Sequence, residues 1–262
     1  VGSAGLAGQR QRGDARGGAA RGGQAEIERI AVAEHRDVEA ETVLDETVTG
    51  GARLTDTGSK ARMAGQMFDA QARMNLNNLV IDGLPSAVHR EAFERLLAIV
   101  GRPENLAGLL QARLQQAYPP LVQGKRAPAS ALPLLKLADL RTVPGFDEAT
   151  IKALEPFVIF LPKRVRSGAA EFVTENTKVN VNTAPPEVLA AEVADVDLQA
   201  ARRFVEGVRA RTFFASLDVA RSRFDGSPVL PANLLSVGSD FFLVRGMVRF
   251  GRVESQSEAL LY

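Results

Sequence analysis

The side chains best suited to covalent or metal chemistry are scarce in this chain of 262 residues. It contains no Cys and only two His, His35 and His89. Thiolate nucleophiles, disulfides and zinc sites built on Cys are therefore excluded. Because the two His lie far apart in the sequence, they do not suggest a multi-His metal site.

The remaining polar residues do not form the pattern of a known active site. No P-loop, Rossmann glycine motif, GxSxG or HExxH occurs in the sequence. His89 lies beside Arg90 and Glu91, so we expect it on a helix in a solvated or capping role. Several aspartates lie near expected turns and helix starts, where Asp makes local hydrogen bonds; they are Asp82, Asp139, Asp147 and Asp195. The sequence therefore predicts a protein without catalytic activity.

Amide and hydroxyl side chains cluster in one segment, VNVNTAPPEVL, which begins at Val179. Asn180 and Asn182 can hydrogen-bond backbone groups in a tight approach to a helix. Thr183 is a natural helix cap, and Pro185 and Pro186 suit the first helical turn. We expect these residues to be structural.

Two segments, near 137–161 and 179–221, have the pattern of short helices joined by tight turns. The second resembles the helix-hairpin-helix modules of competence-type DNA receptors, in which backbone amides at a glycine-rich hairpin hold a phosphate. Here Asp195 and Asp197 occupy the hairpin, and Asp147 follows the first one, so phosphate is repelled. DNA binding by the competence-receptor type of protein remains the alternative.

That alternative depends on four arginines of an expected long helix over 197–211. Asp195, Asp197 and Glu206 lie among them in the sequence, which favours local ion pairs over a phosphate track. The candidate phosphate ligands are Arg202, Arg203, Arg209 and Arg211.

The elements follow the order strand, helices, strands, which predicts an α+β fold with an α-helical insertion. We expect residues 1–62 to be a disordered or atypical N-terminal region, with a Gly- and Arg-rich start and an acidic helix over 26–44. Residues 63–80 and 232–262 should form a sheet, and residues 81–231 the insertion. Ser86 should cap the first inserted helix. No apolar run approaches the roughly 20 residues of a membrane span.

Three motifs together give a family resemblance. The first is DAQARMNLNNL, with Asp69, Arg73, Asn75 and Asn77. The second joins Leu161-Pro162 to the segment 179–189, and the third is SDFFLVRGMV at 239–248. Over residues 63–262 the chain resembles minor pseudopilin K of the type II secretion system, also called general secretion pathway protein K.

The resemblance implies a pilin-like α/β domain whose helical insertion contains helix-hairpin-helix (SAM-like) units. It implies a non-catalytic place at the tip of the pseudopilus, supporting pilus initiation and protein export across the outer membrane. The implied partners are the I- and J-type minor pseudopilins and the assembly platform, with no nucleic acid. The implied location is the inner membrane, with the globular domain in the periplasm.

Two family features cannot be matched to this sequence. The apolar anchor helix is not recognisable in residues 1–62, and the chain has no Trp for the W-x-D-x-D stretch of the family. Some members bind calcium in the insertion, and no ligands for it can be assigned here. Calcium therefore remains open as a cofactor.

Overall fold

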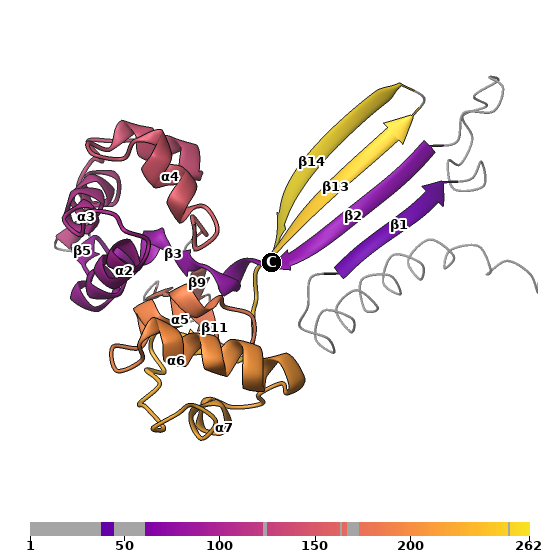
Figure 1. Cartoon of the computed structure of the whole chain (residues 1–262). Helices are drawn as coiled ribbons and strands as arrows, with labels where there is room; N and C mark the ends of the chain where they lie inside the picture. Colours follow the sequence, from indigo (N-terminus) through magenta and orange to yellow (C-terminus); the bar gives the residue numbers. More distant parts are fainter. Residues whose placement is uncertain (1–37, 45–60, 123–124, 163, 167–172, 251) are drawn as a thin grey trace, which may run out of the picture.

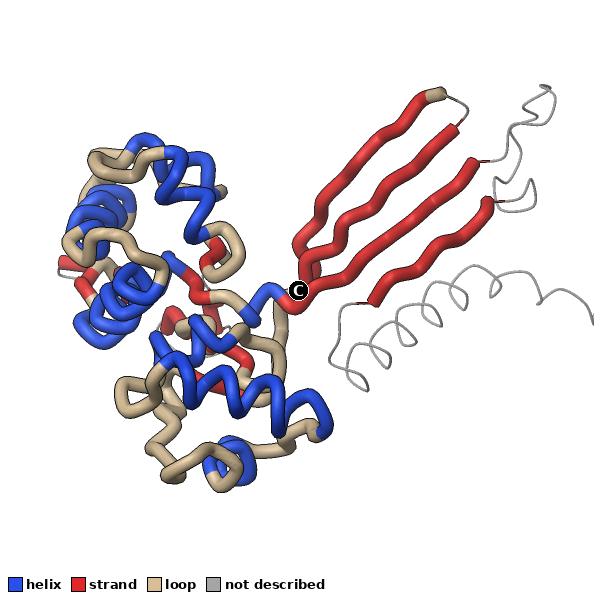
Figure 2. The backbone as a smooth tube through the Cα atoms, in the orientation of Figure 1, coloured by secondary structure: helices blue, strands red, loops and turns tan. Residues whose placement is uncertain are grey.

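The computed structural model describes residues 38–44, 61–122, 125–162, 164–166, 173–250 and 252–262. Four long strands form a sheet that projects from a body of short helices (Figure 1). The tube view shows the same division, with the helices gathered in the body and the long strands outside it (Figure 2).

The sheet is antiparallel throughout and has the order β1-β2-β13-β14. Its strands are β1 (Val38–Leu44), β2 (Ala61–Asp69), β13 (Phe242–Phe250) and β14 (Val253–Leu261). The central pair, β2 and β13, is separated in the sequence by the whole helical body, and Asp69 lies opposite Phe242. The body is therefore an insertion between two neighbouring strands.

The sheet differs from the predicted one at its limits. Residues 38–44 form β1, whereas we expected a helix over 26–44; the remainder of that helix and the Gly- and Arg-rich start lie outside the described residues. Strand β2 ends at Asp69 rather than continuing toward residue 80, because two 3₁₀ turns follow, η1 (Ala70–Ala72) and η2 (Leu76–Leu79). The side chains of Asp69 and Asn75 accept hydrogen bonds from the first turn of η1 and η2, respectively.

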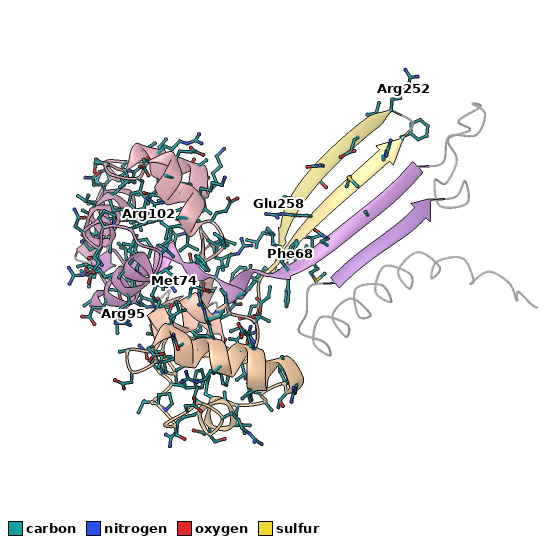
Figure 3. All side chains as sticks on the ribbon, viewed as in Figure 1. Phe68, Met74, Arg95, Arg102, Arg252 and Glu258 are labelled. Atoms are coloured by element: carbon teal, nitrogen blue, oxygen red, sulfur yellow. The ribbon has the colours of Figure 1, made fainter. Side chains whose placement is uncertain are left out.

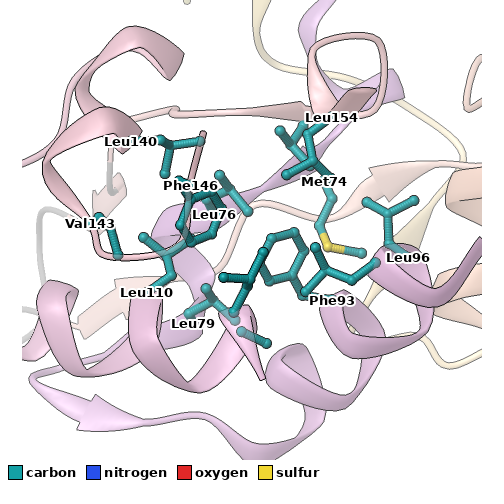
Figure 4. Packing of buried hydrophobic residues seen from close by; sticks show 14 of the residues in the cluster. Met74, Leu76, Leu79, Phe93, Leu96, Leu110, Leu140, Val143, Phe146 and Leu154 are labelled. Carbon is teal, nitrogen blue, oxygen red and sulfur yellow. The ribbon is translucent and has the colours of Figure 1, made fainter. Parts of the chain in front are cut away.

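One lobe of the body contains α2 (Ala87–Ile99), α3 (Leu106–Ala117), the 3₁₀ helix η3 (Leu137–Thr142) and α4 (Glu148–Leu154). The hydrophobic core of this lobe is formed by side chains from these helices and from the 74–79 segment, which point toward one another in Figure 4. The fully buried residues of this core include Leu76, Leu79, Phe93, Leu96, Leu110 and Leu154.

The other lobe contains α5 (Pro186–Glu192), α6 (Leu198–Arg203) and α7 (Leu217–Arg221). The long helix expected over 197–211 is not regular: α6 continues as the π turn η4 (Phe204–Val208) and the 3₁₀ turn η5 (Arg209–Arg211). Phe204 is buried between Phe214 and Phe224, with ring centroids 5.3 and 3.6 Å away.

The remaining strands form short two-stranded pairs outside the main sheet. The pairs β3 (Met74–Asn75) with β8 (Val158–Ile159), and β11 (Val179–Asn180) with β12 (Leu235–Ser236), are parallel. The remaining pairs are antiparallel: β4 (Val80–Ile81) with β5 (Leu84–Pro85), β6 (Leu121–Val122) with β7 (Lys125–Arg126), and β9 (Arg164–Arg166) with β10 (Val173–Glu175). Residues 232–241 thus lie outside the main sheet, although we expected them in it.

The helix starts agree only in part with the sequence. Asp147 caps α4, because its Oδ1 accepts a hydrogen bond from the amide of Thr150 at 2.7 Å. Ser86 precedes α2 without capping it, since its Oγ lies 2.8 Å from Nδ1 of His89. Thr183 does not cap α5 either, because α5 begins at Pro186 and the hydroxyl of Thr183 is bonded to Asp69.

Candidate functional site

The carboxylate of Asp69 lies where the sheet meets the body, and it accepts four hydrogen bonds. Its Oδ1 accepts from the amide of Gln71 at 2.8 Å. Its Oδ2 accepts from Asn180 Nδ2 at 3.0 Å, Thr183 Oγ1 at 2.5 Å and Ser239 Oγ at 2.6 Å. One acidic group from β2 therefore joins the segment before α5 and the segment before β13.

Gln71 makes a second set of bonds at the same place. Its side-chain amide donates to the carbonyl of Lys178 at 2.8 Å, and its Oε1 accepts from the backbone amides of Asp240 and Phe241. The backbone amide of Ala70 also donates to Phe241 at 3.0 Å. Gln71 is buried, so these bonds are shielded from water.

The asparagines of the NVNT segment extend this network into the second lobe. The Oδ1 of Asn180 accepts from the amide of Asn182 at 3.0 Å. Asn182 donates to the carbonyls of Phe214 and Val237 and accepts from the amide of Phe214 at 2.9 Å. Both asparagines are buried. As expected, the Asn180 side chain bonds backbone near the helix approach, whereas the Asn182 side chain bonds backbone 32 and 55 residues away instead.

The asparagines after β2 bind the first lobe to the loop before β11. Asn75 Oδ1 accepts from the amide of Leu161 at 3.0 Å, and Asn77 Nδ2 donates to the carbonyl of Leu161 at 2.9 Å. Asn78 exchanges two bonds with the backbone of Thr177. Arg73 lies half-buried on the same segment.

The structure thus brings six of the seven family-motif residues into one bonded region, here called the junction: Asp69, Asn75, Asn77, Asn180, Asn182 and Thr183. Gln71, Asn78 and Ser239 also belong to it; they lie within the three sequence motifs, but they were not predicted as site residues. Gln71 and Asn78 are adjacent to motif residues, which is a usable signal. Ser239 begins the third motif, at 239–248, but no local pattern connects it with Asp69, from which 170 residues separate it.

Two buried titratable groups lie outside the junction. We expected a solvated or capping role for His89; it is buried, and its Nδ1 lies 2.8 Å from Oγ of Ser86 at the start of α2. Burial lowers its pKa to about 4, so the ring is neutral at pH 7. Glu192 at the end of α5 is also buried, and burial raises its pKa to about 8 against the opposing effect of Arg95. Arg95, labelled on α2 in Figure 3, donates to the carbonyl of Ala191 at 2.7 Å.

Three of the candidate phosphate-binding arginines have partners in the structure. Arg202 pairs with Glu187 at 3.3 Å, and Arg203 pairs with Asp225 at 2.9 Å. The guanidinium of Arg209 binds the carbonyls of Val181 and Ala184, and burial lowers its pKa to about 10.

These partners differ from the predicted ones. We expected Asp195, Asp197 and Glu206, but Asp197 instead caps α6 by accepting from the amide of Ala200 at 2.7 Å. Arg211 is exposed. The arginines of this helix thus do not form a phosphate track.

Over the described ranges, no three His, Asp or Glu side chains gather where a metal ion could be held. Calcium, which the resemblance left open, thus gains no cluster of carboxylate ligands among the described residues. The chemistry of the junction is that of neutral donors around one carboxylate, which suits a structural connection.

Comparisons with known proteins place this architecture in a family. Two models of type II secretion system protein K match residues 72–163 and 179–238, together more than half of the chain. Curated protein sequences gave no significant match.

Among solved structures, the fold is similar to a chain in the crystal structure of the GspK-GspI-GspJ complex from the enterotoxigenic Escherichia coli type 2 secretion system. The TM-score is 0.57 at 18% identity, over 92% of this chain and 89% of that chain. The two family models carry the assignment, and the structural match agrees with them in fold. The chain belongs to the protein K family of the type II secretion system, whose members are minor pseudopilins.

Proposed function

We propose that this chain acts at the tip of the type II secretion pseudopilus as a structural subunit, with the I- and J-type minor pseudopilins as its direct partners. There it would support pilus initiation and protein export across the outer membrane, through contact with the assembly platform. The junction is the observation that carries the proposal, because it holds a strand-built part and a large helical body as one unit without any catalytic group. The similar GspK chain was solved in complex with GspI and GspJ, which supports the choice of partners.

We further propose that the helix pairs near 137–161 and 179–221 are helix-hairpin-helix units that do not bind DNA. Gly145 in the first turn has φ of 89°, and a Cβ there would lie 2.6 Å from Leu106, so this turn requires glycine. The arginine pairs of α6 support the absence of DNA binding. The competence-receptor alternative gains no support from the comparisons.

The domain division is also our proposal: a pilin-like sheet, an insertion over about 81–231 and an N-terminal region up to about 62 of which β1 is part of the sheet. Among the described residues, no helix is both long and apolar enough to span a membrane. We place the globular part in the periplasm, with attachment to the inner membrane, as the family implies.

The proposal is tested by co-expressing the chain with an I-type and a J-type pseudopilin from one type II system and purifying through a tag on the chain. We expect the three proteins to elute together in size exclusion. An unrelated pilin-like protein in place of the J-type subunit is the control and should not co-elute. Elution of the chain alone, with folded partners present, would contradict the proposal.

DNA binding is measured by fluorescence anisotropy with duplex DNA at two salt concentrations. We expect no salt-dependent binding near physiological ionic strength, because the arginines of α6 are engaged with carboxylates. Micromolar binding that weakens steeply with salt, and that is lost in the R202A/R203A variant, would favour the DNA-binding alternative.

A further inference from the structure

Strand β14 forms an open edge of the main sheet. All nine of its residues are exposed, and no strand among the described residues pairs with its outer side. Natural edge strands are usually protected by charged side chains, especially Lys, by Pro or by a bulge, and the only charges on β14 are Glu254 and Glu258. The sequence VESQSEALL contains no Lys or Pro, and its pairing with β13 is unbroken over nine residues.

The direction of the backbone groups on β14 follows from one bond at the base of the sheet. The amide of Ala70 donates to Phe241 at 3.0 Å, so the next residue, Phe242, directs its N–H and C=O away from β2 and toward Leu261. Alternation along the strand then gives the residues whose N–H and C=O point out of the sheet: Glu254, Gln256, Glu258 and Leu260.

The side chains of these same residues lie on one face of the sheet. Glu254 lies opposite Arg249, and Glu258 lies opposite Arg245, whose Nε is 2.8 Å from its carboxylate. Figure 3 labels Glu258 near the base of β14. On this face, β13 thus presents the basic residues Arg245 and Arg249, and β14 presents the acidic residues Glu254 and Glu258. A strand added beside β14 would fit best with basic side chains opposite these two glutamates.

The other face of β14 is apolar at both ends, with Val253 69% and Leu261 46% exposed. A second copy of the chain is a poor occupant of this edge. Antiparallel pairing of two β14 strands would place the Glu254 and Glu258 of both copies on one face, where like charges repel.

We propose that the outer edge of β14 is a binding site for an extended segment of another protein. The segment has Lys or Arg residues four positions apart, opposite Glu254 and Glu258, and small or apolar residues on its other face. Main-chain hydrogen bonds to the four outward residues would provide affinity, and the two carboxylates would select the basic segment. This site goes beyond the proposed function and does not depend on which pseudopilins bind the chain.

The first test uses the free, full chain. Amide hydrogen exchange followed by ¹⁵N NMR should show fast exchange at Glu254, Gln256 and Glu258 and slow exchange at Ser255 and Ser257, whose N–H groups bond β13. Protection of the outward amides in the dilute free chain would mean that the edge is already covered by the chain itself and would overturn the proposal. If protection of the outward amides increased with protein concentration, the edge would bind a second copy of the chain, and the proposal of another protein as its partner would be overturned.

The second test adds a synthetic nine-residue peptide with two lysines four positions apart among valines and threonines. At millimolar peptide, the outward amides should become protected. A peptide with glutamate in place of lysine should bind about tenfold more weakly at low salt, and one N-methylated at the bonding amides should not bind. Equal binding of all three peptides, or no protection by any, would overturn the proposal.

Variants of the edge give an independent check. Gln256→Pro removes one outward N–H while leaving the bonds to β13, and it should lower affinity for the lysine peptide about tenfold. Gln256→Ala keeps the N–H and is the matched control, with affinity within about twofold of the original. If Gln256→Pro disturbs the sheet in the NMR spectrum, the N-methylated peptide still decides between the outcomes. Unchanged binding to a folded Gln256→Pro chain would contradict main-chain pairing.

Discussion

At the level of single residues, Asp69 shows how neutral donors can hold a half-buried carboxylate. Its four hydrogen bonds come from one backbone amide, one side-chain amide and two hydroxyls. A carboxylate satisfied by neutral donors makes charge-assisted bonds, which are stronger than bonds between neutral groups. Its donors come from three separate segments of the chain.

We expect Asp69→Ala to lower the free energy of unfolding by about 2–3 kcal/mol, because three side-chain donors and the amide of Gln71 lose their acceptor. Urea unfolding followed by circular dichroism measures this loss. Asp195→Ala is the matched control, since Asp195 is exposed, and it should change stability by less than about 0.5 kcal/mol. If the two variants had equal free energies of unfolding, the hydrogen bonds of Asp69 would not stabilise the fold.

Asn182 offers a second test at this scale. One buried hydrogen bond contributes about 1 kcal/mol, which would be the loss for Asn182→Ala if its side chain made a single bond. The structure gives Asn182 three bonds to the backbone of Phe214 and Val237, so we now expect about 2–3 kcal/mol. Thermal unfolding with a calorimeter gives the difference, and a loss below about 0.5 kcal/mol would show that water replaces these bonds.

At the level of elements, the contact between α2 and α5 joins the two lobes and buries a carboxyl group. Glu192 ends α5, and Arg95 of α2 binds the neighbouring carbonyl of Ala191. Because burial raises the pKa of Glu192 from 4.5 to about 8, the folded chain holds its proton more tightly than the unfolded chain. The contribution of Glu192 to the free energy of unfolding is fully present below pH 4.5 and is lost as the pH rises toward 8.

His89 has the opposite dependence, because burial lowers its pKa from 6.5 to about 4. Its contribution is present above pH 6.5 and is lost as pH falls toward 4. The two effects oppose each other at intermediate pH, and Glu192 alone acts between about pH 6.5 and 8. We therefore expect stability to fall across that upper interval.

Glu192→Gln should remove the fall in stability between pH 6.5 and 8, because glutamine has no proton to lose. Urea midpoints at four pH values in this interval measure the slope for both chains. Glu187→Gln, on the same helix with its carboxylate bonded to Arg202 at 3.3 Å, is the matched control and should keep the slope. A slope that persists in Glu192→Gln would assign it to another group.

At the level of the whole molecule, the sequence correctly predicted features that depend on residues close together in the chain. The cap of Asp147 on α4 joins residues three positions apart, and the residue types alone reveal it. The insertion of helices between strands also followed from the order of patterns. The limits of β2 were wrong because Asp69 and Asn75 begin 3₁₀ turns, which interrupt an alternating pattern that otherwise resembles a strand.

The remaining features depend on contacts between distant segments. Thr is a residue type that often caps helices, but the hydroxyl of Thr183 donates a hydrogen bond to the carboxylate of Asp69, 114 residues away. The helix over 197–211 contains a π turn where Phe204 packs between Phe214 and Phe224, and no local signal places it. The charged neighbours of His89 in the sequence predicted a solvated or capping role, whereas the fold buries the ring.

The insertion of the body between β2 and β13 has a mechanical consequence. Both connections leave the sheet at the same end, where Asp69 lies opposite Phe242 (Figure 1). A force that draws the body away from the sheet pulls these two strands in the same direction, so it does not slide them past each other. Sliding occurs instead against β1 and β14, whose seven and nine residue pairs share the load at once. The resistance of the molecule to such a force therefore depends on the pairing of β1 with β2 and of β14 with β13, while β2 and β13 move together.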